Sequence, residues 1–462
     1  MTLPRPRIAI IGGGPGGYES ALVAAQLGAD VTIFDADGLG GACVLTDCVP
    51  SKTLIESATT MTSMTRSASL GIQTAAGKNA DLSVDAPALY TRVKALAAAQ
   101  SHDITEHVAA EGITVVPGHA RFVGPKTIAS GDMILAADVI LIATGATPRI
   151  LPDAVPDGER ILTWRQLYDL QCLPSDLIVV GSGVTGAEFA GAYQALGSNV
   201  TLVSSRDRVL PHEDQDAAEV IEDVFRRRGM NVLNRSRAAA VHRKGDGVVV
   251  TLSDGREVSG SHCLLTVGMI PRTADLGCSE AGVSLDGNGF IEVDRVSRTS
   301  APGIYAAGDC TGVQMLASVA AMQGRIAMWH ALGEAVQPIK LSNVAANIFT
   351  DPEIATVGIS QAAVDRGSVQ ARVVTQQLDT NPRAKMAGVR HGFVKLLTRP
   401  GTGAILGGVI VAPRASELIL PVSIAVEQGL TASQLAHTFS VYPSLSGSIT
   451  EAARQLMEFS GQ

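Results

Sequence analysis

Two stretches of the chain share one hydrophobic pattern, a short β-branched run that ends in a glycine cluster. The run at 7–11 is followed by GGGPGG at 12–17, and the run at 177–180 is followed by GSGVTG at 181–186. Each cluster leads into an alanine-rich stretch of helical character and then into another β-branched run, at 31–34 and 200–203. A strand, a glycine turn and a helix in this order predict two parallel βαβ units.

The glycine spacing in both clusters is G-x-G-x-x-G, the fingerprint of a dinucleotide-binding turn. The first glycine permits the tight turn, the second lets a pyrophosphate approach, and the third lets the helix pack on the strand. These positions are Gly12, Gly14 and Gly17 in the first unit and Gly181, Gly183 and Gly186 in the second. Two nucleotide sites in one chain predict an enzyme that transfers reducing equivalents between two cofactors.

The rest of the chain predicts further elements of both kinds. Residues 85–110 are alanine-rich with a helical period, and residues 276–345 favour strands followed by a helix at about 316–332. From about 346 onward, strand-like runs at 392–397 and 405–411 alternate with helices, as in an α+β domain. The fold class is therefore α/β, with two Rossmann-like dinucleotide-binding domains and a C-terminal α+β domain.

Composition narrows the functional classes. The 462 residues are 46% hydrophobic and 17% charged, which is typical of folded proteins with large cores. The net charge is -8 without a lysine or arginine run, which disfavours a nucleic-acid surface. The apolar stretch 405–426 contains two prolines and two charged residues, so it is a poor membrane span. Six cysteines are too few for a secreted disulfide framework, and we predict a cytoplasmic protein with no metal site.

Three further positions point to the ligand of the first unit. Asp35 ends the strand after the first fingerprint, where a carboxylate can accept hydrogen bonds from a ribose 2′-OH. Thr144 and Gly145 close the buried run 139–142, and Gly308 and Asp309 close the run 303–307. In this order the three positions resemble those of FAD-binding flavoproteins that carry two dinucleotide domains. The resemblance implies that Asp309 contacts the flavin ribityl chain and that Gly308 leaves room for it.

Cys43 and Cys48 lie shortly after the Asp35 strand, with four residues between them. Residues five apart do not share one helix face, so we expect a distorted first helical turn, which Pro50 tolerates. A thiol pair at a helix start has a lowered pKa because the helix dipole favours the thiolate. The spacing therefore predicts a redox-active pair.

The block GGACVLTDCVPSK at 40–52 resembles the redox-disulfide motif of the pyridine nucleotide-disulfide oxidoreductases, such as dihydrolipoyl dehydrogenase and glutathione reductase. The likeness continues through FTDPE at 349–353, RAK at 383–385 and GFVK at 392–395. It implies FAD and NADP or NAD as cofactors, and a homodimer. It also implies four segments: 1–150 and 276–345 for FAD, 151–275 for NAD(P) and 346–462 for dimerisation.

The same resemblance assigns roles to single residues. Cys43 would be the interchange thiol that faces substrate, and Cys48 the thiol against the flavin. Lys52 would lie near flavin N5, paired with Glu188 just past the second fingerprint. The remaining flavin contacts implied by the family are Gly41, Thr144, Gly145, Gly308, Asp309 and Ala317.

The sequence departs from the family pattern near its C-terminus. Disulfide reductases of the family carry a histidine before a proline there and a glutamate five residues later, because thiol exchange needs an acid–base. Here these positions are Tyr442 and Gly447. A phenol with a pKa of about 10 is a poor base at neutral pH, so we predict a quinone-type acceptor. In this respect the chain is similar to the lipoamide-dehydrogenase-like NAD(P)H:quinone reductases of actinobacteria, although that group has no cysteine at the position of Cys43.

Three alternatives stay open at this point. The first is a dihydrolipoyl dehydrogenase or other disulfide reductase whose base comes from an unidentified group. The second is a soluble pyridine nucleotide transhydrogenase, whose members also carry tyrosine before that proline. The third is a degenerate flavoprotein that serves as a sensor or scaffold, which the intact Lys52 and Glu188 argue against.

The strand after the second fingerprint bears on the choice of nicotinamide. NAD-preferring members would carry glutamate at the position of Ser204, where it repels a 2′-phosphate. Ser204, Ser205, Arg206 and Arg208 instead provide donors, and arginine suits phosphate geometry. We therefore predict use of NADPH, preferred over or comparable with NADH, and include Gly268 among the NAD(P) contacts.

Overall fold

The first dinucleotide domain is built on a five-stranded parallel sheet in the order β18-β7-β1-β2-β3. The computed structural model describes residues 5–72 and 82–457. In this sheet, β1 pairs in parallel with β2 on one side and with β7 on the other. Its strands are β1 (Arg7–Ile11), β2 (Asp30–Asp35), β3 (Thr114–Pro117), β7 (Val139–Ile142) and β18 (Ile304–Ala306). Four of these strands are largely buried on both faces, as expected of β-branched runs in a parallel sheet, whereas the edge strand β3 is mostly exposed.

The second dinucleotide domain repeats the arrangement in the order β12-β11-β10-β16-β9. Its central strand pairs in parallel with the strand after the fingerprint helix, in the same register as in the first domain. The strands are β9 (Ile161–Leu162), β10 (Asp176–Val180), β11 (Asn199–Val203), β12 (Asn231–Leu233) and β16 (His262–Leu265). The two predicted βαβ units are thus confirmed.

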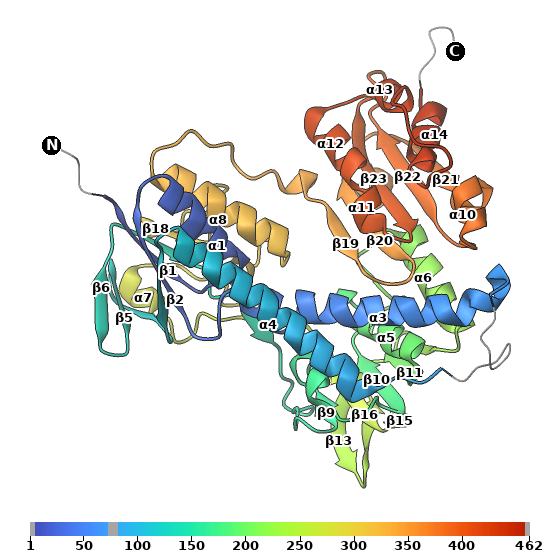
Figure 1. The fold of residues 1–462 in the computed structure, drawn as a ribbon, viewed down its shortest axis with the longest axis horizontal. Coiled ribbons are helices and arrows are strands. Elements are labelled where there is room, and N and C mark those ends of the chain that lie inside the picture. Colours follow the sequence, from blue (N-terminus) through green and yellow to red (C-terminus); the bar gives the residue numbers. More distant parts are fainter. Residues whose placement is uncertain (1–4, 73–81, 458–462) are drawn as a thin grey trace.

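Long helices cover these sheets, and one of them crosses between the two domains. The fingerprint turns open α1 (Pro15–Gln26) and α5 (Val184–Leu196), and α8 (Ala317–Ala331) packs along α1. The predicted helix at 85–110 is α4 (Ala86–Ala110), whose first turn is capped by the Asp85 carboxylate. Figure 1 shows α3 (Cys48–Arg66) crossing from the first domain to the second, where it packs against α5. This crossing places the cysteine segment between the two nucleotide domains.

Smaller antiparallel sheets flank both domains. One consists of β4 (Arg121–Gly124), β5 (Thr127–Ser130) and β6 (Met133–Ala136), and another of β13 (Ala238–Lys244), β14 (Gly247–Leu252) and β15 (Glu257–Gly260). The pair β8 (Ala146–Pro148) and β17 (Met269–Pro271) links the chain where it enters and leaves the second domain. The expected strands between 276 and 316 are wrong except for β18, because turns and the short helix α7 (Cys278–Ala281) occupy most of this segment.

The C-terminal domain is of the α+β class, as predicted, and consists of an antiparallel sheet with helices around it. Its strand order is β19-β20-β23-β22-β21, with every pairing antiparallel. The strands are β19 (Ala346–Ile348), β20 (Glu353–Gly358), β21 (Arg372–Gln377), β22 (Phe393–Thr398) and β23 (Ile405–Ala412). The helices are α9 (Gln361–Asp365), α10 (Pro382–Met386), α11 (Ala415–Leu418), α12 (Leu420–Gln428), α13 (Ala432–Ala436) and α14 (Gly447–Gln455).

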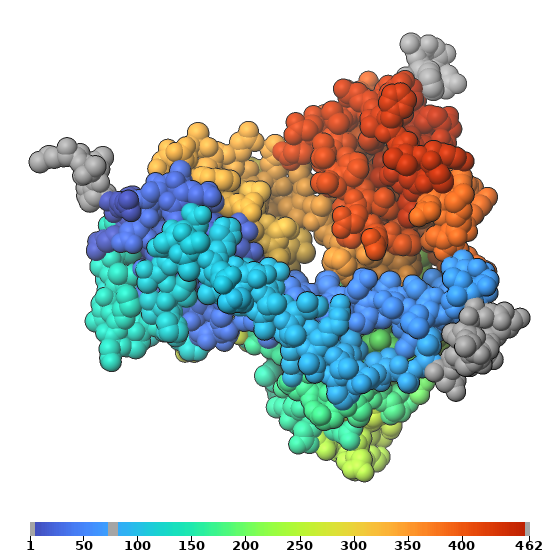
Figure 2. Space-filling model, in the orientation of Figure 1, coloured from blue at the N-terminus to red at the C-terminus, as the bar shows by residue number. Residues whose placement is uncertain are grey.

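A buried ion pair joins this domain to the second nucleotide domain. The Lys395 ammonium on β22 lies 2.8 Å from the Asp214 carboxylate, which caps α6 (Gln215–Arg227), and 2.7 Å from Asp216. Lys395 and Asp214 are both almost fully buried, so the pair fixes one orientation of the two domains. Figure 2 shows an opening bounded by the C-terminal domain, α3 and the gold-coloured region that contains α8.

Candidate active site

The two fingerprint turns have the geometry that the glycine spacing predicts. A Cβ on Gly12 would collide with the Ala143 carbonyl, and a Cβ on Gly17 would collide with the Gly12 carbonyl. By contrast, a Cβ on Gly14 would meet no atom within 4 Å. The first and third glycines are therefore required by the protein itself, whereas the space at the second is free for a ligand.

The second turn has the same geometry. A Cβ on Gly181 would collide with the Thr266 carbonyl, and a Cβ on Gly186 with the Gly181 carbonyl. A Cβ on Gly183 would again meet nothing within 4 Å. Both turns also open uncapped helix N-termini, whose backbone N–H groups favour phosphate. A dinucleotide pyrophosphate fits each turn.

Asp35 lies at the end of β2, beside the first turn. Its carboxylate accepts hydrogen bonds from the backbone N–H groups of Gly13 at 2.6 Å, Gly38 at 2.5 Å and Asp37 at 3.0 Å. Asp35 therefore holds the turn in shape from the position where the sequence predicts a ribose contact. The ribose contact itself stays a prediction.

The cysteine pair differs locally from the expectation of one distorted helical turn. Cys43 lies in a separate short helix, α2 (Gly41–Leu45), and Cys48 begins α3 after two intervening residues. A left-handed Gly41 at φ 56°, whose Cβ would lie 2.8 Å from the Gly14 Cα, brings α2 against the first fingerprint turn. Two helices, rather than one strained turn, bring the sulfurs together.

The two thiols hydrogen-bond to each other and have different proton affinities. This hydrogen bond lowers the pKa of Cys43, and it raises the pKa of Cys48, which burial raises further. Cys43 is therefore the more nucleophilic thiol of the pair, in agreement with the role that the family resemblance implies for it.

Lys52 and Glu188 form an ion pair one helical turn beyond Cys48. The Lys52 ammonium lies 2.8 Å from Glu188 Oε2 and 4.9 Å from the centre of the Phe349 ring, while Glu188 Oε1 accepts the Phe349 N–H at 2.9 Å. Burial lowers the pKa of Lys52, but the attraction of Glu188 and Cys48 outweighs it, so the net pKa is raised. This geometry holds a permanent positive charge beside the thiols.

Asp47 is a site residue that the sequence reasoning missed. Its carboxyl has a pKa raised by burial and by Glu188, against the opposing effects of Lys52 and Arg165. A signal was available, because an aspartate stands directly before Cys48 at the predicted helix start. Arg165 and Tyr168 were also missed, since nothing near them in sequence relates them to the cysteines.

The residues expected at the flavin ring and ribityl chain line the same region. Burial and the nearby Asp47 raise the pKa of Asp309 to about 6. No hydrogen bond to its carboxyl is present within residues 5–72 and 82–457, so both oxygens are free for ribityl hydroxyls. The backbone of Gly308, at φ 82°, donates its N–H to the buried Gln323. Ala317 begins α8 without a side-chain cap, so its helix N-terminus can stabilise negative charge on a ring.

Thr144 and Gly145 follow β7, which pairs with β18, the strand that ends two residues before Gly308. Gly145 has φ 70° and open space at its Cβ position. Together with the free space at Gly14, these features fit an FAD molecule extended from the first fingerprint to α8. When bound, such a flavin would accept a hydride from a reduced nicotinamide.

The predicted nicotinamide contacts divide into buried and exposed groups. The Ser204 hydroxyl is fully buried, 2.7 Å from the Ser182 hydroxyl, and accepts the Arg206 N–H at 3.1 Å. Ser205 and the Arg206 side chain are exposed beside it. Gly268, at φ 102°, follows β16 and opens the return to the first domain. Ser204 thus shapes the loop, and Ser205 and Arg206 remain available to a ligand.

Tyr442 is not brought to the cysteine pair within one chain. Its side chain is 82% exposed on the C-terminal domain, between the exposed Phe439 and α14. No histidine is among the groups that act on either thiol in the part of the chain that the structure describes.

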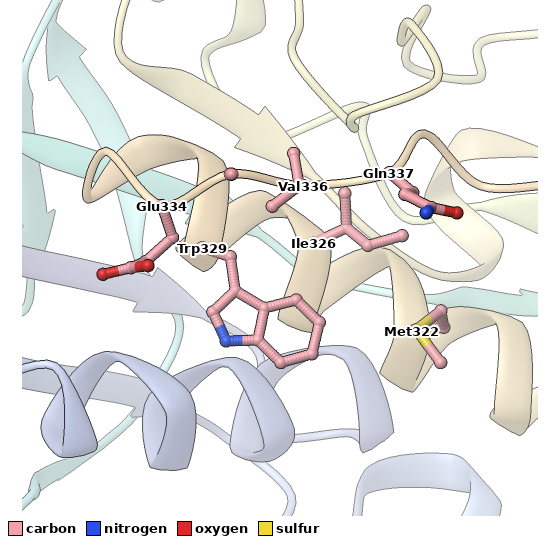
Figure 3. A pocket seen from close by; sticks show the side chains of 7 residues that line it. Met322, Ile326, Trp329, Glu334, Val336 and Gln337 are labelled. Carbon is pink, nitrogen blue, oxygen red and sulfur yellow. The ribbon is translucent and has the colours of Figure 1, made fainter.

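A separate pocket of about 410 Å³ lies between α8 and residues 334–337. Figure 3 shows Met322, Ile326 and Trp329 projecting from α8 toward it, with Glu334 at one side. None of the predicted site residues lines this pocket.

No helix of residues 5–72 and 82–457 has the length and apolar character needed to cross a bilayer. The same residues contain no cluster of three His, Cys, Asp or Glu side chains suited to a metal ion.

Comparison with protein families agrees with this geometry. Residues 6–324 match the model of the pyridine nucleotide-disulphide oxidoreductases, and residues 344–453 match the dimerisation domain of the same family. The chain belongs to the pyridine nucleotide-disulphide oxidoreductase family. It is accordingly a flavoprotein oxidoreductase, and the family resemblance inferred from its motifs is confirmed.

Curated relatives within the family differ in their activities. The chain is 56% identical to an NAD(P)H dehydrogenase (quinone) of Mycobacterium tuberculosis, over 98% of this chain and 94% of that protein. It is 33% identical to the dihydrolipoyl dehydrogenase of Bacillus subtilis, over 96% of this chain and 97% of that protein.

Solved structures show the same arrangement of domains. The crystal structure of LpdA from Mycobacterium tuberculosis matches with a TM-score of 0.93 at 55% identity, covering 98% of this chain and all of that chain. The flavoprotein disulfide reductase RclA of Escherichia coli matches with a TM-score of 0.87 at 24% identity, covering 97% of this chain and 99% of that chain. The second match bears on the fold alone.

Proposed function

We propose that this protein oxidises NAD(P)H and passes the electrons through FAD to a quinone-type acceptor. The observation that carries the proposal is that Tyr442 occupies the family's base position, while no imidazole of residues 5–72 and 82–457 acts on either thiol. Disulfide exchange needs a group that takes and returns a proton near neutral pH, whereas electron transfer to a quinone needs none at the thiols. The name of the 56% identical relative supports the same acceptor class.

The residues have separate roles in this proposal. The two fingerprint turns bind the pyrophosphates of FAD and of the nicotinamide nucleotide. Lys52, held by Glu188, keeps positive charge near the flavin N5, and the N-terminus of α8 at Ala317 stabilises negative charge on the ring. Asp309 accepts from the ribityl chain.

The nucleotide is proposed to be NADPH, used in preference to NADH or comparably with it. Ser205 and Arg206 are exposed at the end of β11, and no acidic side chain occupies the position of Ser204. Arginine donates two parallel hydrogen bonds to a phosphate, so this loop suits a 2′-phosphate.

The active form is proposed to be a cytoplasmic homodimer. Phe439, Val441 and Tyr442 form an exposed, largely apolar surface on the domain that matches the family's dimerisation model. Such a surface needs a partner, and a second copy would cover it. In that assembly Tyr442 would approach the active site of the second copy.

An acceptor panel tests the proposed function. The purified yellow protein is assayed with NADH and with NADPH against menadione, benzoquinone, lipoamide and glutathione disulfide. We expect kcat/KM for the quinones to exceed that for lipoamide by about 100-fold or more, the size of a missing acid–base. Comparable lipoamide and quinone turnover would contradict the proposal.

The hydrogen-bonded Cys43–Cys48 pair favours a second candidate, a disulfide reductase. Two variants separate the candidates. Cys48→Ser should alter the spectrum of the reduced protein but keep most of the quinone turnover, whereas a disulfide reductase would lose its acceptor activity. The double variant Tyr442→His/Gly447→Glu rebuilds the family dyad and should raise lipoamide turnover while leaving quinone turnover nearly unchanged.

A further inference from the structure

The segment 204–214, which we call the nucleotide loop, joins the end of β11 to the start of α6. Two buried residues of this loop attach it to its neighbours. Leu210 donates its N–H to the Ser182 carbonyl of the second fingerprint turn at 2.8 Å, and Val209 donates its N–H to Glu222 of α6 at 3.0 Å. Residues 205–207 of the loop are exposed. The position of α6 therefore determines where the exposed part of the loop lies.

Ion pairs join both ends of α6 to the C-terminal domain. At the N-terminal end, Asp214 caps the helix with its carboxylate, which lies 2.8 Å from the Lys395 ammonium of β22. Asp216 in the first turn of α6 lies 2.7 Å from the same ammonium. At the other end, the C-cap residue Arg228 lies 2.7 Å from Asp351. One helix of the second nucleotide domain is thus attached to the C-terminal domain at both of its ends.

The two attachments differ in burial and in their position relative to the nucleotide loop. Lys395 and Asp214 are 2% and 3% exposed, whereas Arg228 and Asp351 are 22% and 31% exposed. A buried ammonium and a buried carboxylate can separate only by leaving unpaired charges in the protein interior, which is strongly unfavourable. Solvent reduces this penalty for the more exposed Arg228 pair. The more rigid attachment is therefore the one where the nucleotide loop meets α6.

Lys395 is an unusual residue for its strand. All six residues of β22 are buried, and a lysine side chain is seldom fully buried unless it is paired. Both carboxylates that pair with this lysine, Asp214 and Asp216, come from the nucleotide domain rather than from its own. An apolar residue would fill a purely structural position in the C-terminal domain at no loss of stability. The pairing therefore points to a role of Lys395 in the nucleotide domain.

We propose that Lys395 is a positioning residue for the pyridine nucleotide. It acts through Asp214 and Asp216, because by holding the N-terminal end of α6 it keeps the nucleotide loop in place for the adenosine end of NAD(P)H. A loop that is already ordered loses less conformational freedom on binding, so the nucleotide binds more tightly. The inference rests on the proposed function, which assigns this loop to the 2′-phosphate. The domain that matches the family's dimerisation model thereby contributes to nucleotide affinity.

Calorimetric titration of the oxidised, FAD-loaded protein with NADP⁺ measures this contribution without turnover. In Lys395→Met we expect the Kd of NADP⁺ to rise about tenfold or more, because two carboxylates lose their shared cation and the N-terminal end of α6 shifts. The fragment 2′,5′-ADP, which carries the adenosine end alone, should lose affinity by the same factor. Saturating NADPH should still reduce the flavin at the wild-type rate, because the nicotinamide ring lies at the opposite end of the nucleotide.

Arg228→Met is the matched control, because it breaks the other attachment of the same helix to the same domain. Both variants should lower the melting temperature, and Lys395→Met should lower it more. Only Lys395→Met should weaken NADP⁺ binding, whereas the Kd of Arg228→Met should stay within about twofold of the wild-type value. A purely structural role of Lys395 would lower the melting temperature without this difference in Kd.

A second variant covers the case in which Lys395→Met does not fold. The double variant Lys395→Met/Asp214→Asn removes one charge of each sign, and asparagine still caps α6. It should show the same loss of NADP⁺ affinity, because the attachment of α6 to β22 is lost while no buried charge is left unpaired.

Two results would overturn the proposal. The first is a Kd within about twofold of the wild-type value in the Lys395 variants. The second is an equal loss of affinity in Arg228→Met, since any loosening of the domain contact would then suffice. The titrations do not involve an acceptor, so quinone turnover can fail while they succeed. If the wild type binds NAD⁺ more tightly than NADP⁺, NAD⁺ and ADP become the probes and the same comparison holds.

Discussion

The two dinucleotide domains are close structural copies that differ at a few chemically decisive positions. Their central strands pair in the same register, and each first and third glycine would collide with an equivalent carbonyl. At the end of the second strand, however, Asp35 stands in one copy and Ser204 in the other. Asp35 accepts the Gly13 N–H, and Ser204 meets the hydroxyl of Ser182 at the corresponding place. In both domains this side chain forms a hydrogen bond with the fingerprint turn, but it is a charged carboxylate in the first domain and a neutral hydroxyl in the second.

A glutamate seven residues after the first glycine also differs between the copies. Glu19 of α1 pairs with Arg325 of α8 at 2.7 Å inside the first domain, and both side chains are partly exposed. Glu188 of α5 pairs with Lys52 of α3 across the two domains and is only 4% exposed. The second glutamate has therefore become a link between the domains. The comparison teaches that shared packing contacts determine the repeated scaffold, whereas the positions that differ between the two domains determine their separate functions.

The largest expected effect comes from the third glycines. Gly17→Ala and Gly186→Ala place a methyl group into a carbonyl oxygen, and overpacking of this kind costs about 1–3 kcal/mol. Gly17→Ala should lose bound FAD, whereas Gly186→Ala should keep its yellow colour and lose NAD(P)H oxidation by more than about 100-fold. Flavin absorbance and stopped-flow reduction measure the two outcomes. As the control, Gly183→Ala should keep the melting temperature but still lose nucleotide binding, because only the ligand needs that space.

The two glutamates should differ in their effect on stability. Glu188→Leu leaves Lys52 unpaired, and we expect a loss of about 2–3 kcal/mol, below the 3–5 kcal/mol of fully buried pairs because Lys52 is partly exposed. Glu19→Leu breaks a more exposed pair and should cost about 1 kcal/mol or less. Melting temperatures of the two variants test the difference. Equal shifts in melting temperature would show that the ion pair between the domains contributes no more to stability than the pair within the first domain.

The exposed loop after β11 should decide the nucleotide. Arg206→Gln removes a donor for the 2′-phosphate and should lower kcat/KM for NADPH relative to NADH by about tenfold, or roughly 1.4 kcal/mol. Steady-state kinetics with both nucleotides measure the ratio. Arg243→Gln, which breaks a surface pair on β13, is the matched control and should leave the ratio unchanged. A wild-type kcat/KM about tenfold higher with NADH would refute the proposed nucleotide.

The smallest expected effect concerns the strand beside each central strand, which starts with Val139 in the first domain and His262 in the second. Burial, and then the adjacent Arg160, lowers the pKa of His262 to about 4. In the unfolded chain this histidine binds its proton with a pKa of about 6.5. The contribution of neutral His262 to the free energy of unfolding is therefore fully present above pH 6.5, and it is lost as the pH falls toward 4. His262→Gln should reduce the loss of melting temperature between pH 7.5 and pH 5 by a few degrees. Identical acid sensitivity in both proteins would contradict the assignment.

The local features were readable from the chain because they depend on neighbours in sequence. Glycine spacing and β-branched runs predicted both βαβ units, and the block around Cys43 and Cys48 predicted the family. Each of these sequence patterns is contained within a segment of about 35 residues. The domain limits at 150, 275 and 345 and the roles of the site residues remain predictions. Strands were overpredicted between 276 and 316, where apolar residues are buried by turns instead of a sheet.

What only the tertiary structure decided is which distant groups meet at the thiols. Lys52 and Glu188 are 136 positions apart, yet their charged atoms lie 2.8 Å from each other because α3 crosses onto α5. Arg165 and Tyr168 of the 3₁₀ helix η2 (Trp164–Asp169) act on this site electrostatically, and Asp47 makes no cap hydrogen bond with its own helix. Electrostatic effects depend on the distance between charges and on burial, and neither quantity can be predicted from the local sequence. The sequence by itself therefore determined the two nucleotide-binding units and the cysteine pair, and the packing of α3 decided the charges that surround the sulfurs.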